Sequence, residues 1–338
     1  MRVTVLLRTC TYRACVLSVA AMLGILGPQL LRAQSNSGGL DLLLPTGARA
    51  TAMGTAVAAE PGGEALWWNP AGIARLTKPE FALDHFSTVF VESGDAVSLI
   101  LPAVPVGVFA ISARLFNYGV QPSLSGTGEE LGSTSQRSLA LGGSFAAAFG
   151  DHFSAGLTFR LYQFSALCTG LCDNVVSGDF NTGVLDAGIQ FRPSLNGPFA
   201  FGAVLSNVGP KLQVHDQPQA DELPARIHVG MSFRPTSENW DPAIHVRTTV
   251  EFVSTPALSS QEVHLGGEVG YVSGPSTLSL RGGYIYQQPL PGSEKSGGAS
   301  VGFGLASGRV RLDFAQVFET LSTGLGKPPR YISIHVGL

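Results

Sequence analysis

Residues 153–162 read FSAGLTFRLY, and this stretch carries the pattern that decides the fold. Its odd-numbered positions hold Phe, Ala, Leu, Phe and Leu, whereas its even-numbered positions hold Ser, Gly, Thr, Arg and Tyr. Alternation with a period of two is typical of a β-strand, because successive side chains point to opposite faces of a sheet. The same alternation recurs over residues 244–252, 262–271, 309–314 and 332–338. An all-β fold is therefore predicted.

Composition distinguishes a membrane barrel from a soluble β-sandwich, which would alternate in the same way. Charged residues make up only 13% of the 338-residue chain and hydrophobic residues 44%, whereas soluble domains carry about 25% charged residues. The alternating segments are about 9 to 12 residues long, as a tilted strand needs in order to cross a bilayer. The formal net charge of −3 argues against a nucleic-acid partner. We expect the outer face to contact outer-membrane lipid.

Short and long connections alternate along the chain, as they do in outer-membrane barrels. The short turns are expected at residues 149–151, 195–198 and 273–275, and the long polar loops at 121–133, 166–181 and 207–222. Strands are expected to start near Phe81, Ala96, Gly107, Ser138, Phe153, Gly183, Phe199, Ile227, Ile244, Val263, Leu278, Ala299, Val310 and Tyr331. About fourteen strands, an even number, predict a transmembrane antiparallel β-barrel over residues 79–338.

Residues 1–33 are expected to be a signal peptide. Arginines at positions 2, 8 and 13 form a basic start, and residues 15–26 form an apolar run without an acidic residue. This run is short for a membrane-spanning helix, which needs about 20 residues. Residues 31–33, Leu-Arg-Ala, then offer a small residue for cleavage. We expect the mature chain to begin at Gln34 and to be exported through the inner membrane to the outer membrane.

Two cysteines remain in the expected mature chain. Cys168 and Cys172 lie in the sequence CTGLC. In an exported loop, this spacing favours a small disulfide. A metal site would need further His or Cys residues close by, and none is near in the sequence. A Cys168–Cys172 disulfide is therefore predicted, and no metal and no cofactor are expected.

Residues 34–78 do not alternate and are expected to form a small hatch inside the barrel. The stretch 47–76 reads GARATAMGTAVAAEPGGEALWWNPAGIARL, and its Ala and Gly residues allow close packing against a barrel wall. Trp67 and Trp68 are large anchors whose indole N–H groups need partners. Pro70 fixes φ and removes an amide donor. Asn69 can hydrogen-bond the backbone two residues further on or cap the turn that follows.

The hatch stretch resembles the N-terminal signature of the PorV/PorQ family, barrels related to the FadL-like transporters of long-chain fatty acids. The matching residues are Gly47, Ala48, Arg49, Ala50, Met53, Gly54, Trp68, Asn69, Pro70, Ala71 and Gly72. Thr55 replaces the family's second glycine, and residues 61–64 replace the two aspartates often found before the tryptophan. The resemblance implies an outer-membrane barrel of about fourteen strands with an N-terminal hatch. It also implies either a shuttle in type IX secretion or a carrier of hydrophobic molecules.

Charged residues of both signs share one predicted face of the later strands. They are His245, Arg247, Glu251, Glu262, His264, Glu268, Arg281, Arg311 and Asp313. Two interpretations are open: an interior network of ion pairs that fills a plugged barrel, or a polar track along which a substrate moves. A metal bound by the two histidines would require a third converging ligand. The ion-pair network is the favoured interpretation.

No catalytic machinery is expected. His85 and Ser87 lie two positions apart on one face of the first strand, which is a lipase-like pairing. Nucleophilic catalysis also requires an orienting acid, and none is evident on that face. Aromatic residues at strand ends are expected to form a girdle at the membrane interfaces; they are Tyr271, Tyr284, Tyr286, Phe314, Phe318 and Tyr331.

The sequence favours an accessory or shuttle in protein export or surface attachment, with secretion-system proteins or exported cargo as partners. The alternatives are a FadL-like channel for the uptake of a hydrophobic small molecule and a structural barrel without transport. The modest loop lengths favour the first function over the second. A tunnel toward the hatch or a gap between strands would favour the channel.

Overall fold

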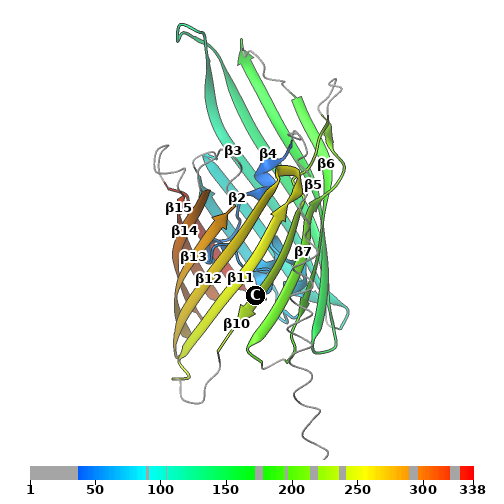
Figure 1. The fold of residues 1–338 in the computed structure, drawn as a ribbon, viewed down its shortest axis with the longest axis vertical. Helices are drawn as coiled ribbons and strands as arrows, with labels where there is room; N and C mark the ends of the chain where they lie inside the picture. The colour runs from blue at the N-terminus through cyan, green and yellow to red at the C-terminus, as the bar shows by residue number, and fades with distance from the viewer. Residues whose placement is uncertain are drawn as a thin grey trace, which may run out of the picture. The chain divides into compact units, whose positions relative to one another are not determined.

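Fourteen antiparallel strands close into a barrel in the computed structural model (Figure 1), which describes residues 37–88, 91–103, 105–171, 178–194, 197–213, 220–235, 241–288, 296–319 and 328–338. The strands are β1 (Glu80–Ser87), β2 (Ser93–Ala103), β3 (Gly107–Leu124), β4 (Glu130–Phe149), β5 (Phe153–Gly170), β6 (Gly178–Phe191), β7 (Phe199–Val208), β10 (Arg226–Phe233), β11 (Ile244–Thr255), β12 (Ser260–Ser273), β13 (Ser276–Gln287), β14 (Ser296–Ser307), β15 (Val310–Glu319) and β16 (Arg330–Gly337).

Every barrel strand pairs with the barrel strands before and after it, and pairing of β1 with β16 closes the ring. The predicted all-β barrel and its fourteen strands are therefore confirmed. A separate two-stranded sheet, β8 (Leu212–Gln213) and β9 (Ala220–Asp221), lies in the connection between β7 and β10. Among the described residues, no helix is both long enough and apolar enough to cross a membrane. The predicted signal peptide lies outside the described residues.

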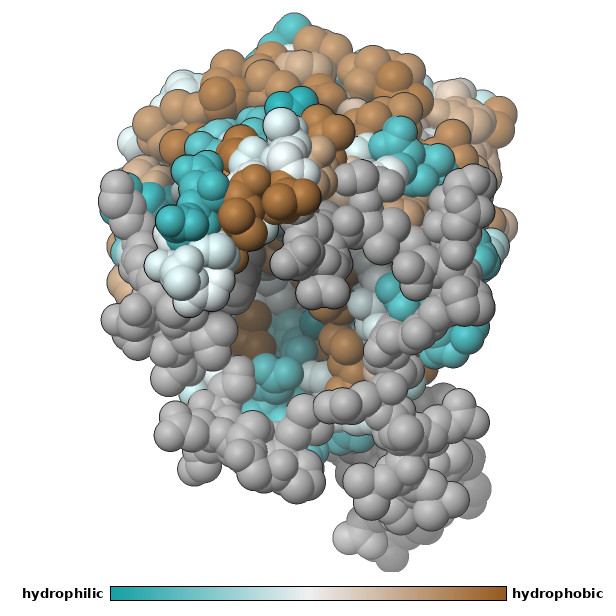
Figure 2. Space-filling view, turned by 90° about the horizontal axis from the view of Figure 1, so that it is seen from above, coloured by the Kyte–Doolittle hydropathy of each residue, from teal (hydrophilic) through white to brown (hydrophobic). Residues whose placement is uncertain are grey.

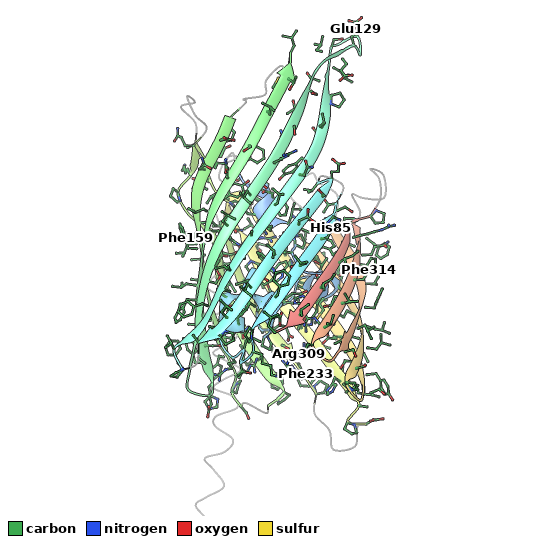
Figure 3. All side chains as sticks on the ribbon, turned by 180° about the vertical axis from the view of Figure 1, so that it is seen from behind. His85, Glu129, Phe159, Phe233, Arg309 and Phe314 are labelled. Carbon is green, nitrogen blue, oxygen red and sulfur yellow. The ribbon has the colours of Figure 1, made fainter. Side chains whose placement is uncertain are left out.

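Most of the described residues in the predicted loops 121–133 and 166–181 belong to strands, so these two predictions were wrong. β3, β4 and β5 contain 18, 20 and 18 residues, and Figure 1 shows β3 to β6 rising beyond the other strands. Glu129 marks the far tip of the β3–β4 hairpin (Figure 3). The polar residues of these stretches were read as loop, yet they continue the ladders of the strands below because hydrogen bonding of a hairpin does not require apolar side chains.

The alternation sorts side chains between the outside and the lumen. In β5, Leu157, Phe159 and Leu161 are exposed, whereas Thr158 and Arg160 are buried. Figure 3 shows Phe159 pointing away from the wall. Exposed Leu, Ile, Val and Phe residues occur in the same outward register on the other strands. An apolar outer surface of this extent is unusual for a protein surrounded by water and suits a lipid surrounding.

The aromatic girdle is only partly as predicted. Tyr271, Tyr284, Tyr286 and Phe318 are exposed on the outer face. Tyr331, by contrast, is only 3% exposed and stacks on Phe86, with ring centroids 5.3 Å apart. Its place in the girdle was therefore a wrong prediction, because its position in β16 has the parity of the lumen-facing residues.

The hatch is a series of short helical turns in the barrel lumen. Its elements are η1 (Leu40–Leu43), α2 (Ala48–Ala52), η2 (Gly63–Trp67) and η3 (Pro70–Ile73). Figure 1 shows this N-terminal segment in blue between the walls of the barrel. Most residues from position 46 to 74 are buried, and they form hydrophobic clusters with lumen-facing side chains of the strands.

Glycines in the wall allow the hatch backbone to approach it. A Cβ atom at Gly283 of β13 would lie 2.0 Å from the amide nitrogen of Gly54, and one at Gly202 of β7 would lie 2.1 Å from the carbonyl oxygen of Ala58. Neither position can carry a side chain unless the hatch moves. Part of the high glycine content therefore serves the contact between hatch and wall.

An arginine placed in the apolar belt tests whether this surface faces lipid. Leu280 points outward from β13 and is 62% exposed. A charged residue near the bilayer midplane costs about 2–4 kcal/mol. We expect Leu280→Arg to lower the free energy of unfolding in lipid vesicles by that amount, as measured by urea titration. Leu124→Arg, at the exposed end of β3, is the matched control and should change it by less than about 1 kcal/mol. Equal losses in both variants would contradict a lipid-facing belt.

Candidate functional site

Asn69 and Pro70 fix the centre of the hatch. Asn69 is the N-cap of η3, and its Oδ1 accepts a hydrogen bond of 3.0 Å from the backbone N–H of Ala71. Its Nδ2 donates to the carbonyl oxygens of Ala58, at 2.6 Å, and Ile189, at 3.1 Å. The Asn69 side chain therefore links two hatch segments to strand β6. Gly72 packs closely against Ala65 within the hatch, because a Cβ atom at position 72 would lie 2.5 Å from the Cβ atom of Ala65.

The remaining residues of the predicted hatch motif lie around this centre. Gly47 and Gly54 have positive φ angles of 93° and 60°, which suit glycine at both ends of α2. Met53 is fully buried beside β12. The Trp68 indole donates to the carbonyl oxygen of Thr46 at 3.0 Å, which satisfies its N–H group. Trp67 is half-buried and borders a cavity described below.

Two glutamates, Glu60, which is buried, and Glu268, which is partly buried, join the hatch to the barrel wall. Glu60 of the hatch forms ion pairs with Arg49 of the hatch, at an N···O distance of 3.0 Å, and with Arg247 of β11, at 2.6 Å. Glu268 of β12 forms ion pairs with the same two arginines, at 3.2 Å each, and with Arg281 of β13, at 2.6 Å. Charges of opposite sign thus surround each other, as buried ions require.

The network continues along the wall toward β15. Arg281 also contacts Asp313 at 2.6 Å, and Asp313 contacts Arg311 at 2.7 Å. Near the hatch, Glu64 accepts hydrogen bonds from the backbone N–H groups of Arg49, at 3.2 Å, and Ala50, at 3.0 Å. Arg247, Glu268, Arg281, Arg311 and Asp313 therefore form one set with hatch residues.

A second polar group lies on β10, β11 and β12. Arg226 contacts Glu262 at 3.1 Å, and Glu262 contacts His264 at 2.8 Å. His228 contacts Glu251 at 2.7 Å. Of the predicted lumen residues, Glu251, Glu262 and His264 belong to this group. Within the described part of the chain, His245 is exposed and takes part in no ion pair.

Several site residues escaped the sequence analysis. Glu60 and Glu64 lie in the hatch stretch, where no alternation marks their direction. Arg226 and His228 have the lumen parity of β10, so their register alone would have placed them beside Glu251 and Glu262. The charge pairs across the hatch, by contrast, depend on how the hatch turns.

A cavity lies between the hatch and the wall. The hatch lines it with Leu42, Leu43, Leu44, Trp67 and Trp68, and the wall lines it with Arg114, Arg160, Asp186, Ser206, Asn207, Arg226 and His228. Figure 2, from above, shows a hollow in the barrel whose walls carry both hydrophobic and hydrophilic residues. An apolar hatch surface thus faces an arginine-rich wall.

A bulge in the wall borders this cavity. The pairing of β6 with β7 shifts between Leu185↔Val208 and Ala187↔Leu205, so Ser206 and Asn207 stand opposite Asp186 alone. Asn207 has a φ of 58°, which is uncommon for a residue other than glycine. Arg160 donates to Asp186 and to Asn207, at 2.8 Å each. The bulge directs additional polar groups into the lumen.

Arg114 is a buried cation that forms no ion pair with a carboxylate among the residues that the structure describes. It is 6% exposed, and its guanidinium contacts the hydroxyl of Thr46 at 3.4 Å and lies over the ring of Phe116 at 4.9 Å. Its Nη2 atom, like Nε of Arg160, has no hydrogen-bond partner among the described residues. Two guanidinium groups at the cavity therefore each keep one buried N–H group without a partner among these residues.

The other predicted candidates have different surroundings. His85 contacts Asp95 of β2 at 2.7 Å, with side chains 56% and 59% exposed, so an acid is present although none was expected. Asp95 was missed in the sequence analysis because this residue lies on the neighbouring strand.

Glu64, Asp313 and His335 bring potential metal ligands within 4.8 Å of one another. Asp313 already forms ion pairs with two arginines, and His335 forms one with Glu80, so these groups satisfy one another's charges.

The predicted disulfide involves a residue outside the described part of the chain. Cys168 lies near the end of β5, whereas Cys172 is not among the described residues, so the Cys168–Cys172 disulfide remains a prediction.

Removing the Glu60 carboxylate tests the anchor between hatch and wall. Glu60→Gln leaves Arg49 and Arg247 without one of their two buried acids. Breaking a buried ion pair costs about 3–5 kcal/mol. We expect that loss in the free energy of unfolding, measured by urea titration in vesicles. Lys211→Met removes an exposed pair with Glu222 and should cost less than about 1 kcal/mol. A loss for Glu60→Gln as small as for Lys211→Met would contradict the anchoring role.

The hatch should loosen in acid through Glu64. Burial alone raises the pKa of Glu64, but His335, whose Nε2 lies 3.7 Å away, and Arg311 outweigh it and lower the pKa to about 2. The ionised carboxylate therefore stabilises the fold fully above its unfolded pKa of about 4.3, and this contribution disappears as the pH falls toward 2. We expect constant stability between pH 7 and 5 and a decline below pH 4. The measurement is urea unfolding against pH, and Glu64→Gln should flatten the acid limb.

Known structures share this fold. The Pseudomonas putida toluene transporter TodX aligns with a TM-score of 0.57 and 14% identity, covering 86% of this chain and 98% of that one. The Ralstonia pickettii toluene transporter TbuX gives 0.54 and 14%, with the same coverage. A Pseudomonas aeruginosa FadL homologue gives 0.51 and 12%, covering 90% and 99%. No protein-family model matches, and no curated protein matches. The chain thus shares its fold with these three structures.

Proposed function

We propose that the protein is an outer-membrane channel that admits a hydrophobic small molecule to its lumen, past the hatch. The observation that carries this proposal is the cavity, where the apolar hatch residues Leu42–44, Trp67 and Trp68 are accessible inside a closed barrel. The apolar outer belt supports a location in the membrane, and the likeness to structures described as toluene transporters supports the class of ligand.

Passage requires the hatch to change its conformation. The cavity encloses about 30 Å³ in this structure, room for about two water molecules. A hydrocarbon therefore enters only when hatch side chains move. Trp67 and Trp68 are half-buried at the cavity, so they are the side chains best placed to turn away. The wall residues that bind the hatch through ion pairs around Glu60 and Glu268 belong to other strands, β11 to β13. They hold the hatch in place while the tryptophan side chains move.

The export role rests on the hatch motif and on the modest loop lengths expected from the sequence. Gly47, Arg49, Met53 and the Trp68–Gly72 run resemble the PorV/PorQ signature, and a shuttle or accessory in secretion remains a prediction from that motif. The fold likeness favours the channel over the shuttle, since the aligned structures are described as transporters. Predicted partners are accordingly membrane lipid and the transported molecule.

Tryptophan fluorescence tests this proposal directly. The chain has three tryptophans, at positions 67, 68 and 240. In a Trp240→Phe background, only the two hatch tryptophans report, and a brominated hydrocarbon should quench them saturably in vesicles. Leu43→Asp, which charges the cavity lining, should weaken this binding about tenfold, a loss of about 1.4 kcal/mol.

Leu40→Asp is the matched control, because Leu40 belongs to the same turn, is exposed and lies outside the cavity lining. It should leave the binding constant unchanged. Quenching that rises linearly without saturation, or that responds equally to both variants, would contradict a hydrophobic site at the hatch.

A further inference from the structure

We propose that Ser206, His228 and Glu251 form a nucleophilic triad that hydrolyses esters in the lumen. Ser206 Oγ lies 3.4 Å from Nε2 of His228, and Nδ1 of His228 lies 2.7 Å from Oε1 of Glu251. A hydroxyl, an imidazole and a carboxylate in this order are the arrangement by which hydrolases activate a serine. This inference goes beyond passage of a hydrophobic molecule through the channel.

The three residues come from three consecutive barrel strands, β7, β10 and β11. Ser206 is the register partner of Arg226, so it stands diagonally across from His228. His228 and Glu251 are buried, whereas Ser206 is half-buried and lines the cavity together with His228. The nucleophile and its base thus face the cavity, whereas the acid does not line it.

The hatch completes the triad by holding its acid. The backbone N–H of Ala58 donates to Oε2 of Glu251 at 2.7 Å, which leaves Oε1 for His228. An acid with one oxygen fixed in this way orients the imidazole and selects its Nδ1–H tautomer. Glu251 is therefore a positioning residue, and the orientation of His228 depends on the seated hatch.

Another group of the same residue types shows what a purely structural arrangement looks like. Thr55 Oγ1 lies 2.8 Å from Nδ1 of His264, and Nε2 of His264 lies 2.8 Å from Oε2 of Glu262. Thr55 and His264 are both buried, and neither lines the cavity. A closed group of this kind satisfies its hydrogen bonds but meets no substrate. The Ser206 group differs because its hydroxyl is accessible from the cavity.

Each step of the reaction has a group to carry it. Ser206 Oγ attacks the ester carbonyl carbon while its proton passes to Nε2 of His228, and that proton then leaves with the alcohol. Water, activated by the same nitrogen, cleaves the acyl–Ser206 bond and releases the acid. Arg114 and Arg160 line the cavity, and the positive charge of their guanidinium groups can stabilise the oxyanion. The leucines and tryptophans of the hatch select an apolar acyl group.

Labelling with a fluorophosphonate tests the proposal on the full-length barrel in vesicles. We expect a covalent adduct on Ser206, located by peptide mass spectrometry, and hydrolysis of p-nitrophenyl butyrate. Ser206→Ala should abolish both, and His228→Gln should slow hydrolysis about a hundredfold. Glu251→Gln should lower kcat and leave KM unchanged. Ser144→Ala is the control, because Ser144 is a buried lumen serine paired with Thr158 rather than with a histidine.

The outcomes separate this proposal from the channel. A folded wild-type barrel without an adduct on Ser206, or a Ser206→Ala variant that hydrolyses the ester as fast as the wild type, overturns the triad. If Ser206→Ala does not fold, Ser206→Cys retains a nucleophile of similar size and should form an acyl-thioester with the same ester. A wild-type barrel whose Trp67 and Trp68 are quenched saturably by the brominated hydrocarbon, but which forms no adduct on Ser206, retains the channel and loses the triad, so the two failures are measured independently.

Discussion

The contact between the buried charges of the hatch and those of the wall is the constraint on which the rest of the lumen depends. Glu60 and Glu268 each form ion pairs with Arg49 and Arg247. Two of these pairs, Arg49–Glu268 and Arg247–Glu60, join a hatch charge to a wall charge. Because buried ions are costly unless paired, these ion pairs favour one position of the hatch in the lumen. The position of the hatch sets the shape of the cavity, since the apolar lining of the cavity consists of hatch residues.

The glycines of the wall make this position possible. Without a side chain at Gly283 and Gly202, the hatch backbone approaches the strands closely enough for direct polar contacts. Asn69 illustrates the result, because its side-chain amide reaches the backbone of both Ala58 and Ile189. The hatch turns have backbone hydrogen bonds of their own, such as those from Thr55 N–H to the Ala50 carbonyl and from Gly62 N–H to the Gly72 carbonyl, and contacts with the wall hold these turns in place. The arrangement of the hatch thus depends on its own turns and on the barrel together.

Transport and hydrolysis make different demands on the same cavity. A channel needs the edge of the hatch near Trp67 and Trp68 to move, whereas the triad needs Ala58 to stay bonded to Glu251. The two demands are compatible, since Ala58 and the tryptophans belong to separate turns of the hatch. The bulge at Ser206 and Asn207 adds polar groups to the wall at this place, which a regular strand pair would not provide.

Local residue patterns were enough to predict the barrel. A period of two, scarce charges and apolar strand faces indicated about fourteen strands and placed Arg247, Glu268 and Asp313 in the lumen. These features are local, so each strand records them in its own residues. The tertiary structure alone decided what the lumen residues contact. Glu60 lies in a stretch without periodicity, and Ser206, His228 and Glu251 are separated along the chain by 22 and 23 positions. Only strand register and the seat of the hatch bring such residues together, because neither spacing nor alternation encodes contacts across a closed ring.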